Sequence, residues 1–201
     1  MGQKQEFQPL TREDTITVVL YRAGIVMSCI IMSGLAYILM MASSISNAAI
    51  ISPSADILAY GLYASVGMSV FFIHLYIGKF KRFLKNLYYV SIVCLIVILS
   101  IGKGSLANAL LREPHSLLLL LPLSGCLGFV TAKEAFCFKL VEGYLLAMIM
   151  PVYLMLVSGS ILTGQGAAYG LVLIAVMLVI FTLRKTPMPI AYDIGDKSAY
   201  Q

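Results

Sequence analysis

GCLGFVTAKEAFCFKLVEGYLLAMIMP, residues 125–151, places a group of ionisable side chains between two long apolar runs. The group consists of Lys133, Glu134, Cys137, Lys139 and Glu142. A helix of about 20 apolar residues crosses the hydrocarbon core of a bilayer, which is about 30 Å thick. The runs on either side of the group are apolar enough to do so. The stretch therefore predicts two membrane-spanning helices with a charged cluster between them.

The composition of the whole chain extends this prediction. Of its 201 residues, 60% are hydrophobic and 11% charged, and the mean hydropathy is +0.94. Soluble domains carry about 25% charged residues. The polar residues form short clusters between apolar runs of roughly membrane-spanning length. We expect a single all-α, polytopic membrane protein whose main partner is the lipid bilayer. Its net charge of +5 does not indicate a nucleic-acid partner, because the basic residues follow predicted loops.

The apolar runs predict a bundle of six transmembrane helices. We place these helices at residues 23–42, 57–77, 87–101, 115–130, 140–158 and 167–183. They form one transmembrane domain, 15–184, between a polar N-terminal tail, 1–14, and a polar C-terminal tail, 185–201, which we expect to be exposed and weakly ordered. The basic stretch 79–85 is expected to be a connector at the membrane surface.

Backbone signals refine these helices. Thr11 and Asp14 resemble a capping box that opens the first helix. Pro122 and Pro151 predict kinks in the fourth and fifth helices, because proline removes a helical hydrogen bond.

Lysine and arginine positions predict the orientation. With six spans, all of the 14 lysines and arginines except Lys103 and Arg112 fall on the side of the N-terminus. Cations are retained on the cytoplasmic side during insertion. We therefore predict that both termini are cytoplasmic.

The sequence does not contain the residue patterns that are typical of disulfide frameworks, metal sites or catalytic sites. The four cysteines show no CxxC spacing, and His74 and His115 stand far apart, so we expect no disulfide framework and no metal site. No catalytic motif is present, and we predict no catalytic residue and no enzyme activity. An intramembrane enzyme would have to use Lys133, Glu134 and Cys137.

The charged cluster allows two interpretations. On a helix, Lys133, Glu134 and Cys137 lie within about a quarter turn of one another, and Lys139 and Glu142 share a neighbouring face. Buried at bilayer depth, such groups indicate function. Alternatively, they form a solvated turn in which Lys139 pairs with Glu142. Arg22, on the same side of the membrane, either extends to the headgroups or pairs with Glu134 or Glu142.

His74 also has two interpretations. A lone imidazole in a span can ligate a haem or pigment, and a more common role is a hydrogen bond to a neighbouring helix. No cofactor is predicted otherwise. Small residues at four-residue spacing, such as Gly61, Ser65 and Ser69, predict close helix packing within the bundle.

Two stretches resemble a known family. DTITVVLYRAGIV at 14–26 and SGCLGFVTAKEAFCFKLVEGYLLAMIMP at 124–151 are similar to an uncharacterised integral membrane protein family of cyanobacteria and their plastid relatives, domain of unknown function 2301. The resemblance implies a thylakoid or plasma membrane. The family has no established activity or site residues to transfer.

Two functional hypotheses follow. The first is a non-enzymatic structural or assembly factor that contacts other membrane proteins, such as photosynthetic complexes. The second is a small-solute or ion transporter with an ionisable site near Lys133, Glu134 and Glu142.

Overall fold

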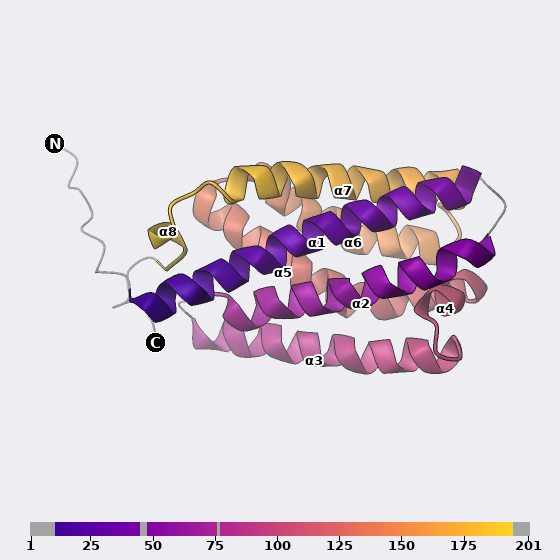
Figure 1. Cartoon of the computed structure of the whole chain (residues 1–201), viewed down its shortest axis with the longest axis horizontal. Helices are drawn as coiled ribbons and strands as arrows, with labels where there is room; N and C mark the ends of the chain where they lie inside the picture. Colours follow the sequence, from indigo (N-terminus) through magenta and orange to yellow (C-terminus); the bar gives the residue numbers. More distant parts are fainter. Residues whose placement is uncertain (1–10, 45–47, 76, 195–201) are drawn as a thin grey trace.

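The computed structural model describes residues 11–44, 48–75 and 77–194, and helices account for nearly all of the regular structure in these ranges (Figure 1). The elements are α1 (Arg12–Ser44), α2 (Ala48–Phe72), α3 (Gly78–Ile101), α4 (Leu106–Arg112), the 3₁₀ helix η1 (Pro114–Leu120), α5 (Leu121–Phe138), α6 (Val141–Ser158), α7 (Gln165–Lys185) and α8 (Ala191–Ile194). Within the described ranges, six helical stretches are long and apolar enough to cross a membrane. The predicted six-helix membrane fold is confirmed.

The helices continue into the charged stretches that the sequence analysis placed in connections. α3 begins at Gly78 and includes the whole basic stretch 79–85, and α5 continues through Lys133 and Glu134 to Phe138. The stretch 79–85 is therefore the first part of α3 and not a separate connector, and Lys133 and Glu134 lie in α5 and not in a solvated turn. Lysine, arginine and glutamate are good helix formers, so a change from apolar to charged residues did not mark a helix end.

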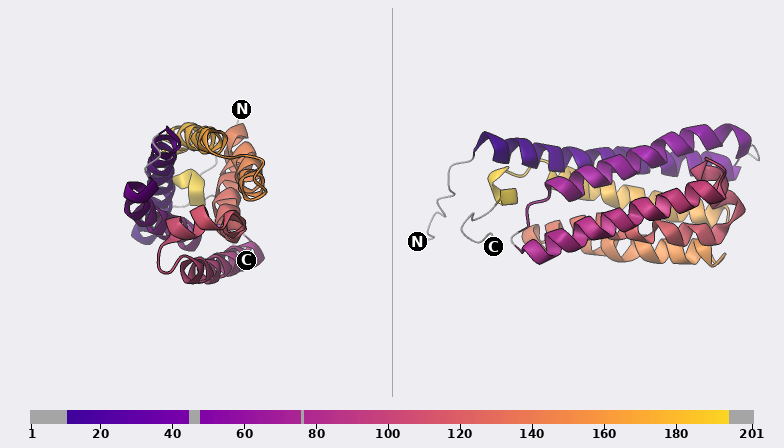
Figure 2. Two further views of the ribbon diagram at one scale, coloured as in Figure 1. Left: turned by 90° about the vertical axis from the view of Figure 1, so that its right-hand side faces the viewer. Right: turned by 90° about the horizontal axis from the view of Figure 1, so that it is seen from below.

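The six long helices run side by side, with α3 at the periphery. α1 packs along α2 and α7, and α5 packs along α6. Seen along the long axis, α3 lies outside the ring that the other long helices form (Figure 2). Only 17% of the apolar window of α3 is buried, compared with 28 to 39% in the other five spans. α3 therefore exposes more of its surface to the membrane than the other spans do.

Small residues bring α1 and α2 into close contact. Ser28 and Ser65 share a hydrogen bond of 2.8 Å, and the Ser69 hydroxyl donates to the Tyr21 carbonyl at 3.4 Å. A Cβ atom on Gly24 would lie 2.7 Å from the Ser65 carbonyl oxygen, so only glycine fits there. Packing within the bundle, as predicted from the small-residue spacing, is confirmed for Ser65 and Ser69.

Pro122 does not kink a span. It stands in the first turn of α5, directly after η1, where its missing N–H costs no helical hydrogen bond. Pro151 does lie inside α6. The fourth predicted span is thus divided between a 3₁₀ helix and an α-helix.

The bundle has two distinct ends. The start of α1 and the end of α7 lie at the same end, together with α8 (Figure 1). The same end holds the start of α3, with the basic stretch 79–85, and the end of α5, with Lys133. We therefore call it the basic end. Lys103 and Arg112 lie at the opposite end, beside α4. This arrangement fits the predicted orientation, and the compartment that the basic end faces stays a prediction.

The chain after α7 differs from the predicted exposed tail. Lys185 is 1% exposed, and Asp193 and Ile194 are buried as well. Residues 186–190 turn back from α7, and α8 lies across the end of the ring of helices (Figure 2). The remainder of the predicted tail, 195–201, and most of the predicted N-terminal tail, 1–10, lie outside the described residues.

Candidate functional site

Glu134 is the centre of a buried group of charges at the basic end. It lies in the last turns of α5 and is 0% exposed. Its Oε1 atom accepts a hydrogen bond from the Tyr21 hydroxyl of α1 at 2.7 Å and another from Lys133 Nζ at 2.7 Å. Its Oε2 atom lies 2.5 Å from Lys185 Nζ, at the end of α7. One carboxylate therefore connects α1, α5 and α7.

Lys185 extends the group to the C-terminal segment. Its ammonium contacts both Glu134 and the Asp193 carboxylate of α8. It also lies 3.8 Å from the centre of the Phe138 ring, within cation–π range. A buried ammonium between two carboxylates and an aromatic face has its charge compensated, so the usual reason for a lysine to reach water is removed.

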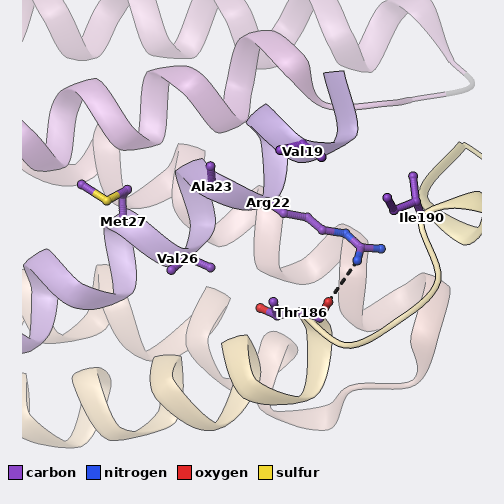
Figure 3. Close-up of a pocket in the computed structure, with 7 residues that line it drawn as sticks. All are labelled: Val19, Arg22, Ala23, Val26, Met27, Thr186 and Ile190. Atoms are coloured by element: carbon purple, nitrogen blue, oxygen red, sulfur yellow. Dashed lines mark hydrogen bonds between the residues drawn. The ribbon is translucent and has the colours of Figure 1, made fainter. Parts of the chain in front are cut away.

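Arg22 completes the group from α1. Its Nε and Nη2 atoms each lie 2.6 Å from Asp193 Oδ2. Its remaining bonds go to backbone carbonyls: Nη1 donates to Thr186 and Met188, and Nη2 donates to Pro189. Figure 3 shows the side chain reaching from α1 to this segment. The planar guanidinium thus holds the chain after α7 against α1.

We call these six side chains the buried ion network. They are Tyr21, Arg22, Lys133, Glu134, Lys185 and Asp193. Three cations and two carboxylates alternate along it, and Lys133 Nζ also lies 5.4 Å from the Tyr21 ring centre. Removing one member of such a buried set leaves an uncompensated charge, which is strongly destabilising. The network therefore fixes α1, α5, α7 and α8 relative to one another.

The other predicted cluster residues lie outside the network. Cys137 is exposed, and Lys139 is an exposed residue with a φ of 55° that ends α5. Glu142 pairs with Arg184 of α7, with Nη1 at 2.7 Å from Oε1. The predicted pairs of Lys139 with Glu142, and of Arg22 with Glu134 or Glu142, are not formed. Arg22 takes Asp193 instead because the C-terminal segment folds back to it.

Sequence reasoning did not find three members of the network. Tyr21 is not among the candidate residues that the sequence indicates, and Lys185 and Asp193 lie in the predicted exposed tail 185–201. The one available signal was Asp193 itself, the acidic residue nearest to α7 on its C-terminal side. Its pairing depends on a fold-back that no local pattern indicates.

His74 lies between α2 and α3, beside α1. Its Nε2 atom is 3.2 Å from the Thr17 hydroxyl, which itself donates to the carbonyls of Glu13 and Asp14. When the Thr17 hydroxyl donates to a carbonyl, Nε2 must be the protonated ring nitrogen that donates to Thr17, and Nδ1 is buried without a hydrogen-bond partner. Burial first, and then the charges of Lys133 and Lys81, lower the pKa of His74 below its ordinary value. A haem or pigment on His74 stays a prediction, and ligation through Nε2 would require the bond to Thr17 to break.

Two surface grooves follow the contact between α1 and α7, and neither reaches the carboxylates. One, of about 390 Å³, is lined by Val19, Arg22, Ala23, Val26, Met27, Thr186 and Ile190 (Figure 3). The other, of about 370 Å³, lies further along the same helices. Both are open and almost entirely apolar. Among the described residues no group of three potential metal ligands occurs.

From the end of α2 onward, the chain matches a model of a known protein family. A family model described as "Uncharacterized integral membrane protein (DUF2301)" matches residues 68–201. The match includes Lys133, Glu134, Lys185 and Asp193, and begins after Tyr21 and Arg22. No curated protein and no solved structure matches the chain significantly.

Proposed function

We propose, from the premise that this chain belongs to the uncharacterised integral membrane protein family DUF2301, that it is a non-enzymatic structural or assembly component of its membrane. The membrane we propose is a cyanobacterial-type plasma or thylakoid membrane. The observation that carries the proposal is that every charged member of the buried ion network is paired within it: each cation contacts a carboxylate, and each carboxylate contacts two cations.

A solute path needs polar groups that face a cavity, and a scaffold needs its helices fixed. The network supports the second requirement. Both carboxylate oxygens of Glu134 contact partners on α1, α5 and α7. The guanidinium of Arg22 donates hydrogen bonds to the segment that closes the basic end. The two grooves are apolar and contact neither Glu134 nor Glu142.

The outer face of α3 is the surface that we propose for membrane-protein partners. Six of its exposed residues, which lie beside the exposed Arg82, Tyr89 and Ile96, recur at alternating spacings of three and four, as in helix–helix seams. They are Phe83, Asn86, Val90, Val93, Val97 and Ser100. Stiff β-branched side chains lose little rotamer entropy when another helix packs on them. We call this row the α3 stripe.

Photo-crosslinking in native membranes tests this proposal. A photoreactive phenylalanine analogue is introduced at Val93 or Val97 of the α3 stripe, and at Met148 of α6 or Val176 of α7 as matched controls with exposed side chains. We expect discrete adducts with the same partner protein at both α3 positions, and lipid adducts at the controls. Lipid adducts at all four positions would contradict a partner on this face.

Transport is the second candidate, and one observation favours it. Glu134 is fully buried within a membrane-spanning helix, and a buried ionisable group in a span is a functional hypothesis by default. In proteoliposomes, solute or proton flux that is lost in both Glu134→Gln and Glu142→Gln would favour a transporter over a scaffold. Flux that is absent from the wild-type protein would remove the reason to keep this candidate.

A further inference from the structure

The basic stretch at the start of α3 carries four cations that have no ion-pair partner in the described part of the chain. They are Lys79, Lys81, Arg82 and Lys85, and we call them the basic segment. No carboxylate of the described residues lies within ion-pair distance of any of them. By contrast, the neighbouring cations Arg22, Lys133, Arg184 and Lys185 are all paired.

The local backbone increases the excess of positive charge. The basic segment occupies the first two turns of α3, where the helix dipole is positive. The residue before the helix, Ile77, gives no side-chain cap, and the first turn contains no acidic residue. Cations in this place are electrostatically unfavourable until an anion joins them. The arrangement therefore favours an anionic ligand from outside the described chain.

The segment lies where lipid headgroups can reach it. α3 is the peripheral helix, and its basic end is at the boundary of a membrane span (Figure 2). Phe80 and Phe83, interleaved with the cations, are 50% and 56% exposed. Exposed aromatic rings beside cations are typical of the membrane–water interface.

Two of the cations face the same direction. Lys81 and Lys85, four residues apart on one face of α3, turn toward the end of α2. Lys85 Nζ lies 5.6 Å from the ring centre of Phe71, and the charge of Lys81 acts on His74. Arg82 is exposed beside them. One turn further along α3 from Lys85, Tyr89 is exposed and contacts Phe71 with a ring-centre distance of 6.2 Å.

A second copy of the chain does not supply the missing charge. Copies in one membrane insert in the same orientation, so pairing through α3 would bring two basic segments together. Like charges at that distance repel.

We propose that the basic segment binds the headgroup of an anionic phospholipid, with the phosphate between Lys81, Arg82 and Lys85 and an acyl chain along Phe71 and Tyr89. Lysine ammonium groups act as point charges toward phosphate, and arginine adds a bidentate contact. The proposed site is on the α2 side of α3 and borders the α3 stripe, since Arg82 and Tyr89 lie one turn from Asn86 and Val93. It is argued from the unpaired cations of the basic segment and does not depend on the proposed function.

Lipid binding to the purified protein tests the proposal. Phosphatidylglycerol and phosphatidylcholine with identical acyl chains are added in equal amounts in detergent, and bound lipids are counted by native mass spectrometry. We expect at least tenfold preference for phosphatidylglycerol, loss of that preference in the triple variant Lys81→Gln, Arg82→Gln, Lys85→Gln, and no change in the control Lys103→Gln, Arg112→Gln. The control removes two exposed cations at the opposite end.

Equal retention of the two lipids by the wild-type protein would overturn the proposal and favour an acidic protein segment as the counter-charge. An unchanged preference in the triple variant would also overturn it. If that variant does not fold, the double variant Lys81→Arg, Lys85→Arg is used instead, because it keeps both charges. We expect it to keep the preference for phosphatidylglycerol. Loss of this preference in the double variant would count against the site.

A second readout uses His74 as a reporter. Because the charge of Lys81 contributes to the lowered pKa of His74, a phosphate bound at Lys81 is expected to raise that pKa, measured by NMR of labelled histidine. Phosphatidylcholine is expected to leave it unchanged. An equal shift with inorganic phosphate would assign the site to a free anion and overturn the lipid assignment.

Discussion

The buried ion network and the basic segment lie at the same end of the bundle, but the cations of the network are paired with carboxylates and those of the basic segment are not paired among the described residues. In the network, Arg22, Lys133 and Lys185 share two carboxylates and are almost entirely buried. In the basic segment, four cations on a peripheral helix have no carboxylate among the described residues. The network is therefore a structural connection, and the basic segment is the charged surface that remains for other molecules.

The difference follows from where the acidic residues stand. Glu134 is on the inner side of α5, and Asp193 is brought back by the turn after α7, so both face α1. α3 lies on the outside of the ring, beyond reach of either. A cation becomes structural or available according to the tertiary position of its helix, and not according to its local sequence.

The largest expected effect is from Glu134→Leu. This substitution leaves Lys133 without its carboxylate and removes one of the two that compensate Lys185. Breaking a buried ion pair by removing one partner costs about 3 to 5 kcal/mol. We expect a loss of this size in the free energy of unfolding, measured in mixed detergent micelles. A loss no larger than that of a surface pair would show that the network is solvated.

Arg22→Lys separates the charge of Arg22 from its geometry. Lysine keeps a cation near Asp193 but loses the planar donors that hold the carbonyls of Thr186, Met188 and Pro189. One charge-assisted hydrogen bond is worth about 1.5 kcal/mol, or roughly a tenfold change in an opening equilibrium. We expect hydrogen exchange of residues 186–194 to accelerate about tenfold or more. The exposed Arg12→Lys is the control, and equal rates in both variants would refute the clamp.

His74 gives the smaller, pH-dependent effect. Its pKa is lowered in the folded state, so the unfolded chain binds the proton more tightly. Stability from this group is present above the ordinary histidine pKa of about 6.5 and decreases as pH falls through that value. We expect a thermal midpoint that declines on acidification in the wild-type protein and declines less in His74→Gln, which keeps a donor for Thr17. Identical pH profiles would exclude this linkage.

The smallest effect is expected at Glu142. Its partner Arg184 has a side chain that is 54% exposed, and exposed ion pairs contribute about 0 to 1 kcal/mol. Glu142→Gln should therefore reduce the free energy of unfolding by less than about 1 kcal/mol. A loss as large as that of Glu134→Leu would place Glu142 in the network after all.

Hydropathy predicted the number of spans because a run of about 20 apolar residues is stable in a bilayer as a membrane-spanning helix. It did not predict where α3 and α5 begin and end, since charged residues are compatible with helix as well as with loop. Lys139 shows the limit: it ends α5 in the left-handed region, where glycine or asparagine is the usual signal. Glu134 was identified as a candidate, and its burial was left open. Its partners Lys185 and Asp193 depend on the fold-back after α7, which is a tertiary event without a local pattern.

Acetylation of lysines in the detergent-purified protein compares the two regions most directly. A water-soluble amine reagent is applied for increasing times, and each lysine is followed by peptide mass spectrometry, with the exposed Lys139 as the internal reference. If the cations of the network are structural and those of α3 are available, Lys79 reacts at a rate close to that of Lys139, while Lys185 stays unmodified until the protein unfolds. Acetylation of Lys185 in the folded protein at the rate of Lys79 would contradict the account.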